Sequence, residues 1–191
     1  MILQDALQKG KSSLHSCSPT AGLDSELLLC YVLHCTKELL IKEPERTLKN
    51  AQLRDLQKLL AERSSGKPIA YLTREKEFFG RKFYVDERVR IPRPETEELV
   101  EEALHFFFKK PAPSTLYPKP WTLIDLGTGS GCIAITMALE LPNCEVIGLD
   151  ISKASLAVAR KNAKLLNCKN VKFLKSDLLS ALQKGIPRLD S

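Results

Sequence analysis

Seven consecutive residues place glycines and polar side chains between a short apolar run and a helical pattern. The segment Asp125-Leu126-Gly127-Thr128-Gly129-Ser130-Gly131 completes the run TLIDLG and opens the run GCIAITMALELP. Glycine allows the backbone to adopt positive φ angles and to approach a ligand closely. The first N–H groups of the following helix have no partner within that helix. The segment therefore predicts a turn that binds a ligand through its backbone.

Two further carboxylates end the next two predicted strands. Asp150 ends the run CEVIGLD, 25 residues after Asp125, and Asp177 ends the run VKFLKSD. A carboxylate at the end of the second strand can accept both ribose hydroxyls of a nucleoside, and Asp177 is placed to meet an adenine amino group. The predicted cofactor-binding residues are Gly127, Thr128, Gly129, Ser130, Gly131, Asp150, Asp177 and Leu178.

The glycine spacing distinguishes between two nucleoside cofactors. A dinucleotide site requires the pattern Gly-x-Gly-x-x-Gly, and Cys132 stands where its third glycine would be. S-adenosylmethionine has no pyrophosphate, so its site does not need that glycine, and Asp125 suits its sulfonium and amino groups. We therefore expect the ligand of this turn to be S-adenosylmethionine. A nicotinamide dinucleotide and a tight turn without a ligand are the alternatives.

The elements around these residues alternate between strand and helix. The runs TLIDLG, CEVIGLD and VKFLKSD are predicted strands, separated by the predicted helices GCIAITMALELP and ISKASLAVARKNAKLLN. Such alternation predicts a parallel sheet with right-handed crossovers. The proline-rich stretch KKPAPSTLYPKP before the first strand is predicted to be an extended linker and a domain boundary.

The first half of the chain has a different pattern. Asp24 precedes the helical run SELLLCYVL, and Asn50 is the predicted N-cap of the helix AQLRDLQKLLAERSS, which Gly66 ends. The segments around residues 78–80 and 83–85 predict a hairpin with a glycine-containing turn. The run ETEELVEEALHFFF predicts a further helix with glutamates in its first turn.

Composition narrows the class of protein. The net charge is +6, and aromatic residues do not alternate with the lysines, so no direct nucleic-acid binding is expected. No apolar run is long enough to span a membrane and no signal peptide is recognisable, which favours the cytoplasm. The six cysteines form no Cys-x-x-Cys pair and lie near no suitably spaced histidine, so no metal site is expected.

Three motifs resemble the HemK/PrmC methyltransferase family over nearly the whole chain. They are the segment LDSELLL (residues 23–29), the segment KPIAYL followed by EFFG (residues 67–72 and 77–80), and the segment IPRPETE (residues 91–97). The resemblance implies an α/β fold with a helical bundle over residues 1–66 and a β-hairpin connector over residues 67–94. Residues 95–191 would then form the first half, strands 3-2-1, of a Rossmann-like class I methyltransferase sheet. One departure is Arg74, where the family often has glycine.

The resemblance also implies a substrate. These enzymes methylate the side-chain nitrogen of the glutamine in the Gly-Gly-Gln loop of class I peptide-chain release factors, and the bundle would contact the release factor. Arg93 and Glu95 are candidates for glutamine recognition. The equal alternative for Glu95 and Glu97 is that they only stabilise the N-terminus of the helix through its dipole. An adenine-N6 nucleic-acid methyltransferase and a non-catalytic S-adenosylmethionine-binding fragment are the alternative functions.

The family's catalytic tetrapeptide, Asn-Pro-Pro-Tyr, does not occur in the 191 residues. An amide nitrogen is a poor nucleophile because its lone pair is delocalised, so catalysis depends on holding and aiming it. The resemblance assigns that task to the tetrapeptide. We therefore name no catalytic residue, and we expect the chain as given to be inactive in methyl transfer.

Overall fold

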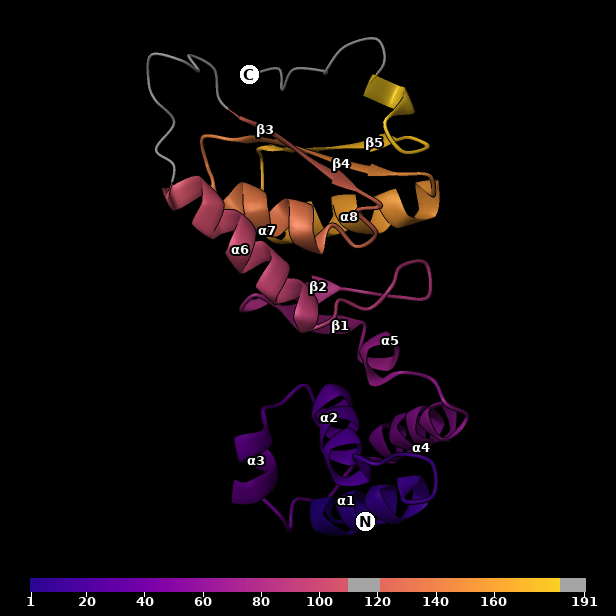
Figure 1. The fold of residues 1–191 in the computed structure, drawn as a ribbon. Coiled ribbons are helices and arrows are strands. Elements are labelled where there is room, and N and C mark those ends of the chain that lie inside the picture. The colour runs from indigo at the N-terminus through magenta and orange to yellow at the C-terminus, as the bar shows by residue number, and fades with distance from the viewer. Residues whose placement is uncertain (110–120, 183–191) are drawn as a thin grey trace. The chain divides into compact units, whose positions relative to one another are not determined.

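The computed structural model of the protein describes residues 1–109 and 121–182 (Figure 1). Contacts between residues divide the chain into two compact units, Met1–Arg74 and Glu75–Ser191. The predicted proline-rich linker lies almost wholly outside the described residues. In the described ranges, no helix combines the length and the apolar character that a membrane span requires.

The first unit is a bundle of helices around a leucine-rich core. Its helices are α1 (Leu3–Leu14), α2 (Ala21–Leu33), α3 (Lys37–Lys42), α4 (Asn50–Ser64) and α5 (Ile69–Thr73). The leucines of α4 recur every three or four residues, and Leu56 is buried against the cluster that contains Leu28 and Leu29 of α2. The predicted bundle is confirmed, because these apolar stripes face one another.

Two helix starts in this unit differ from the sequence prediction. Asn50 is the first residue of α4 and Lys49 is its N-cap, with the Lys49 amide donating to the Gln52 side chain at 2.9 Å. Helix α2 begins at Ala21, so Asp24 lies inside its first turn. Asp24 is buried there and accepts hydrogen bonds from Arg63 Nε and Ser18 Oγ, both at 2.7 Å. The acid at the helix start is therefore a partner for a distant arginine.

The predicted hairpin opens the second unit. Strands β1 (Glu75–Phe78) and β2 (Arg81–Tyr84) pair antiparallel around Phe79 and Gly80, which have φ angles of 51° and 68°. Two consecutive positive φ angles are typical of the tight turn that matches the twist of a hairpin. Arg74, the last residue of the first unit, has a φ of 58°. Glycine adopts this conformation without strain, which gives a physical reason for glycine at this position in the family.

Among the described residues of the second unit, three parallel strands form a sheet in the order β3-β4-β5. They are β3 (Thr122–Leu126), β4 (Glu145–Asp150) and β5 (Val171–Lys175), with Ile124 opposite Ile147 and Leu149 opposite Leu174. The sequence prediction of strands 3-2-1 is confirmed, and β3 lies at an edge of the sheet that the described residues form. The prediction that Asp177 ends the third strand is wrong, since β5 ends two residues earlier.

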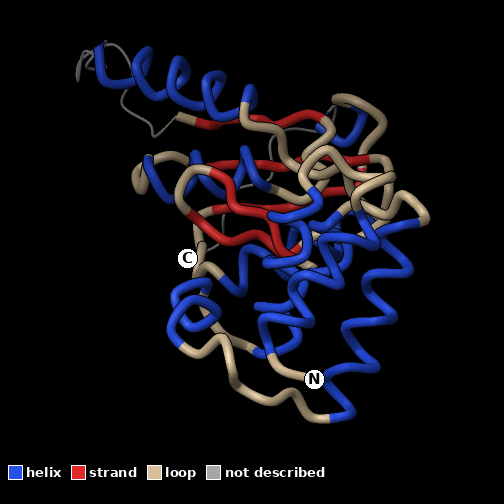
Figure 2. The backbone as a smooth tube through the Cα atoms, turned by 90° about the horizontal axis from the view of Figure 1, so that it is seen from below, coloured by secondary structure: helices blue, strands red, loops and turns tan. Residues whose placement is uncertain are grey.

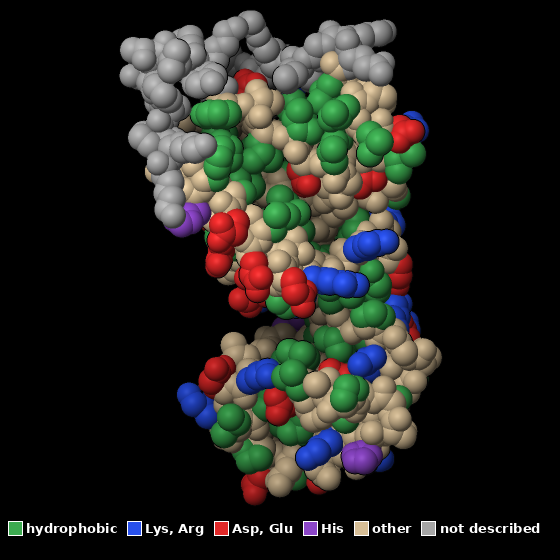
Figure 3. Space-filling view, viewed as in Figure 1, with side chains coloured by type: hydrophobic (Ala, Val, Ile, Leu, Met, Phe, Trp, Pro, Cys, Tyr) green, Lys and Arg blue, Asp and Glu red, His purple; other side chains and the backbone are tan. Residues whose placement is uncertain are grey.

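The helices α7 (Cys132–Glu140) and α8 (Lys153–Leu165) lie on one face of this sheet, with the hairpin on their far side (Figures 1 and 2). Helix α6 (Glu95–Lys109) packs on α7 through Val100 and Leu104. Its acidic side chains gather on the surface (Figure 3), and three glutamates stand in its first turn. Sheet, helices and hairpin share one apolar core, so the carboxyl ends of the strands have a packed support.

Candidate functional site

The glycine turn has open space on its outer side. Gly127, Gly129 and Gly131 have φ angles of 74°, 55° and 80°. A Cβ atom built on Gly127 would meet no described atom within 4 Å, and one built on Gly129 would meet only the Gly127 carbonyl oxygen, at 3.8 Å. The positive φ angles explain why glycine is needed there. The open space leaves room for a ligand against the backbone.

The predicted residues Asp150 and Gly129 are in direct contact. The Asp150 carboxylate accepts the Gly129 amide at 3.0 Å through Oδ2 and the Ser152 amide at 2.8 Å through Oδ1. A carboxylate has about four lone-pair sites, so each oxygen keeps one for a further donor. Asp150 therefore shapes the turn, and it retains the capacity to accept two hydroxyl groups as the sequence predicts.

Thr128 and Ser130 support the turn from inside. Thr128 is buried, and its hydroxyl donates to Asp125 Oδ2 at 2.7 Å. The amides of Gly127 and Thr128 both donate to the Leu149 carbonyl, at 2.8 and 2.9 Å. Ser130 is also buried. The amides of Gly127 and Thr128 hold the turn to β4, and Gly127 and Gly129 form its open side.

Asp125 is a buried carboxyl group in an unusual setting. Burial raises its pKa, the nearby negative charge of Asp150 acts in the same direction, and hydrogen bonds from the Thr128 side chain and the Ala134 backbone oppose both. No lysine or arginine of the described ranges contributes to its electrostatics. A buried carboxyl group with these surroundings favours a ligand that carries positive charge.

The remaining two predicted residues lie on an exposed segment. Asp177 is exposed, and Leu178 is 71% exposed with a φ of 47°. A left-handed leucine is strained, and it is held because the buried Ser176 hydroxyl donates to the Leu178 carbonyl at 2.6 Å. The Ser176 amide in turn donates to the Asp150 carbonyl at 3.0 Å. The segment that follows β5 is thus tied to the end of β4.

Sequence reasoning missed two apolar residues at the same strand ends. Leu126 is 47% exposed at the end of β3, and Ile151 is 63% exposed directly after Asp150. Exposed aliphatic side chains beside a carboxylate suit the flat face of a nucleoside base. The position of Ile151, immediately after a strand-end acid, was the available signal.

A third missed residue is Asn162 of α8. It has no exposed surface and lies among the mostly apolar buried positions of α8, which include Leu156, Ala159 and Ala163. Its side chain donates to the Ser130 carbonyl and to the Tyr84 carbonyl, both at 2.9 Å. The signal in the sequence was a polar residue at a core position of an amphipathic helix.

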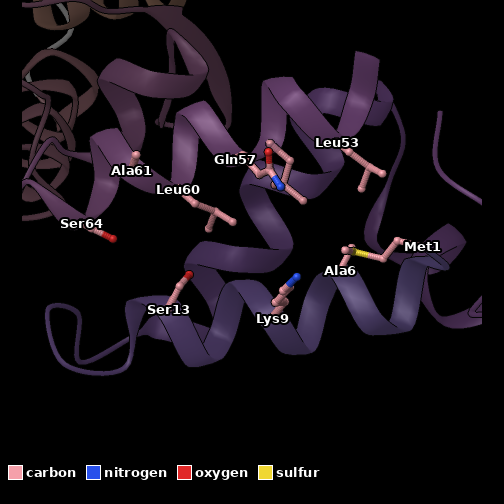
Figure 4. Close-up of a pocket in the computed structure, with 10 residues that line it drawn as sticks. Met1, Ala6, Lys9, Ser13, Leu53, Gln57, Leu60, Ala61 and Ser64 are labelled. Atoms are coloured by element: carbon pink, nitrogen blue, oxygen red, sulfur yellow. The ribbon is translucent and has the colours of Figure 1, made fainter. Parts of the chain in front are cut away.

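A cavity of about 310 Å³ lies elsewhere, between α1 and α4 of the first unit (Figure 4). Its lining is mostly apolar, with Lys9 and Gln57 among the polar residues. None of the predicted cofactor residues contributes to it. The glycine turn remains the candidate site, because it brings open backbone and carboxylates together.

Comparisons with known proteins bear on both units. A family model described as "PrmC N-terminal domain" matches residues 5–73, and one described as "Methyltransferase domain" matches residues 119–187. The release factor glutamine methyltransferase of Koribacter versatilis is 40% identical over 186 residues, which are 97% of this chain and 63% of that protein. Its Escherichia coli counterpart is 37% identical over 182 residues, 95% of this chain and 62% of that protein. Among solved structures, a human methyltransferase 10 domain containing protein aligns with a TM-score of 0.44 and 21% identity, over 56% of this chain and 48% of that chain.

The parallel sheet, the glycine turn and the matching family model define a methyltransferase domain in the second unit. The helical unit before it carries the PrmC N-terminal domain. These matches confirm the resemblance to the HemK/PrmC family that the motifs indicated. It spans somewhat less than two thirds of the length of the two relatives given above.

Proposed function

We propose that the protein binds S-adenosylmethionine at the carboxyl ends of β3, β4 and β5. The observation that carries this proposal is the contact between the Asp150 carboxylate and the Gly129 amide. This contact places the acid at the end of β4 against the glycine turn that follows the neighbouring strand β3, and open space lies beside the turn. A nucleoside across this turn would meet backbone and carboxylate together.

The residues present fit this cofactor. Asp150 has lone pairs for the two ribose hydroxyls, and Leu126, Ile151 and Leu178 offer apolar surface to the base. Asp125, which is buried one residue before the end of β3, would supply negative charge near the cationic end of the cofactor. Once bound, S-adenosylmethionine supplies an electrophilic methyl group on a sulfonium sulfur.

For the substrate, we propose the side-chain nitrogen of a glutamine in a class I peptide-chain release factor, with the helical unit contacting that protein. The names of the relatives support this proposal, and the PrmC N-terminal domain supports a protein substrate over an adenine base. Arg93 and Glu95 are both exposed near the start of α6 and are candidates for glutamine recognition. We also propose that these 191 residues, without the Asn-Pro-Pro-Tyr tetrapeptide, bind the methyl donor and transfer no methyl group by themselves.

The test of cofactor binding is isothermal titration of S-adenosylmethionine into the 191-residue chain and into Asp150→Ala. Charge-assisted hydrogen bonds contribute about 1.5–3 kcal/mol each, so the variant should bind at least about tenfold more weakly. Asp55→Ala, which removes an exposed carboxylate on α4, is the matched control and should bind like the parent. Equal affinities of Asp150→Ala and the parent would remove Asp150 from the site.

The substrate proposal needs a separate assay. The chain is incubated with a class I release factor and S-adenosylmethionine that carries a radiolabelled methyl group. A longer chain that continues through the tetrapeptide should label the glutamine of the Gly-Gly-Gln loop, and the 191 residues alone should not. Label introduced by the shorter chain would show that transfer does not depend on the tetrapeptide.

A further inference from the structure

One buried side-chain amide joins three elements of the second unit. Asn162 of α8 donates through Nδ2 to the Tyr84 carbonyl of β2 and to the Ser130 carbonyl of the glycine turn, each at 2.9 Å. Its Oδ1 accepts the Tyr84 amide at 2.7 Å. The side chain has no exposed surface. The hairpin and the turn are thus connected through a single residue.

Asparagine suits this position because of its chemistry. The two N–H groups of its amide serve two different carbonyls, and its oxygen serves an amide. Aspartate has the same shape but, when ionised, would direct an oxygen at the Tyr84 and Ser130 carbonyls. A leucine at this position would leave all three backbone groups without this hydrogen-bond partner. Loss of a hydrogen-bond partner is costly for a buried polar group, so the turn depends on an amide at this position.

A second contact links the same helix to the segment after the hairpin. Ser155 of α8 donates its hydroxyl to the Arg88 carbonyl at 3.0 Å. Arg88 binds the Asp86 carboxylate through Nε and Nη2, and the Tyr84 hydroxyl donates to the same carboxylate at 3.0 Å. Helix α8 therefore fixes both β2 and the chain that continues from it.

We propose that Asn162 is a positioning residue for the methyl donor, which rests on the proposed cofactor site. Asn162 holds the Ser130 carbonyl, and with it the turn that ends at Gly131, in the shape that the cofactor binds. The Ser130 carbonyl shares a planar peptide group with the amide of Gly131, the N-cap of α7, so the direction of this carbonyl fixes the direction of the Gly131 amide. Because the same amide holds Tyr84, occupation of the turn stabilises the hairpin.

The first test compares cofactor affinity in three forms of the 191-residue chain. Asn162→Asp should bind S-adenosylmethionine about tenfold more weakly at about pH 8, a factor that corresponds to about 1.4 kcal/mol. Leu104→Ala removes a buried side chain of the apolar core to which α8 contributes, and it controls for general loss of stability. It should melt earlier than the parent and bind the cofactor like the parent.

A pH series separates positioning from a purely structural role. Burial raises the pKa of a carboxyl group at position 162, and a protonated carboxyl group can donate to one of the two carbonyls. The ratio of the Asn162→Asp and parent dissociation constants should therefore fall between about pH 8 and about pH 5.5. A folded Asn162→Asp chain that binds within about twofold of the parent over this range would overturn the proposal.

A measurement on the parent chain tests the coupling of the turn to the hairpin even if the Asn162→Asp variant does not fold. The Tyr84 amide donates a hydrogen bond to Asn162 Oδ1, and its hydrogen exchange should slow when S-adenosylmethionine is added. Slower exchange at Gly129 and Gly131 with no change at Tyr84 would show that the turn and the hairpin are not coupled. If the parent binds no S-adenosylmethionine at all, the proposed function fails, and that result is distinct from either outcome for Asn162.

Discussion

Gly127 and Gly131 are the first and last glycines of the same turn. Replacing Gly127 by alanine should mainly weaken ligand binding, whereas replacing Gly131 by alanine should mainly lower stability. Both have positive φ angles, 74° and 80°. Their surroundings differ. A Cβ atom at Gly127 meets no described atom within 4 Å, whereas one at Gly131 would lie 2.9 Å from Ile135 Cδ1 and 3.1 Å from Ala159 Cβ. Gly127→Ala therefore tests the space for the ligand, and Gly131→Ala tests the packing.

The expected losses of stability follow from these distances. A left-handed backbone costs an alanine about 1–2 kcal/mol relative to glycine at either position. At Gly131 the new methyl group also enters a filled core, which typically adds about 1–3 kcal/mol. Ile135 and Ala159 are fully buried, so neither has free space to move into. We expect losses of about 1–2 kcal/mol for Gly127→Ala and about 2–5 kcal/mol for Gly131→Ala.

Two measurements separate the effects. Urea unfolding followed by circular dichroism gives the free energy of unfolding, and calorimetric titration gives the affinity for S-adenosylmethionine. Gly127→Ala should bind at least about tenfold more weakly, because its methyl group occupies the open side of the turn. Gly66→Ala, with a φ of 95° and no described atom within 4 Å of its Cβ, is the control for backbone strain alone.

Either of two results would contradict these expectations. Equal losses of stability for Gly127→Ala and Gly131→Ala would mean that the close contacts at Gly131 carry no energetic cost. Parent-like cofactor affinity in Gly127→Ala would mean that the open side of the turn is not where the ligand lies.

Three further predictions concern buried polar groups away from the turn. Arg63→Ala should destabilise the helical unit by about 3–5 kcal/mol, because it leaves the buried Asp24 carboxylate without its cation; an unchanged urea midpoint would contradict this. Burial disfavours the charged Asp24, but hydrogen bonds from Ser18 and Arg63 outweigh it and hold its pKa below the ordinary value. Asp24 therefore contributes stability above its unfolded pKa of about 3.9 that is lost as pH falls through the lower folded pKa, and Asp24→Asn should flatten this acid dependence. Thr136→Val should raise the free energy of unfolding by about 1 kcal/mol, since the buried Thr136 hydroxyl has no hydrogen-bond partner among the described residues, and an earlier melting transition would refute this.

The elements of the fold were largely predictable from the sequence. The alternation of apolar runs with amphipathic helices indicated the strands β3, β4 and β5 and the helices between them. The hairpin followed from Gly80 and its aromatic neighbours. The starts of α2 and α4 and the end of β5 were misplaced by one to four residues. Element ends depend on capping contacts that a periodic pattern does not contain.

The candidate site was predictable only in part. The glycines were recognisable because positive φ angles favour glycine in any context. The sequence did not indicate that Asp150 already accepts two backbone amides, or that Leu178 adopts a left-handed conformation. Such contacts arise when strand ends that are distant in the chain meet at one edge of the sheet.

The sequence by itself determined the parallel sheet and the glycine turn, because periodicity and the steric freedom of glycine act over a few neighbouring residues. Its motifs also indicated the resemblance to the HemK/PrmC family. Only the tertiary structure decided the partners of the buried polar groups. Asn162 contacts Tyr84 across 78 residues and Ser130 across 32, and Asp24 contacts Arg63 across 39. A buried polar group must be paired, but its partner is selected by the packing that brings distant segments together.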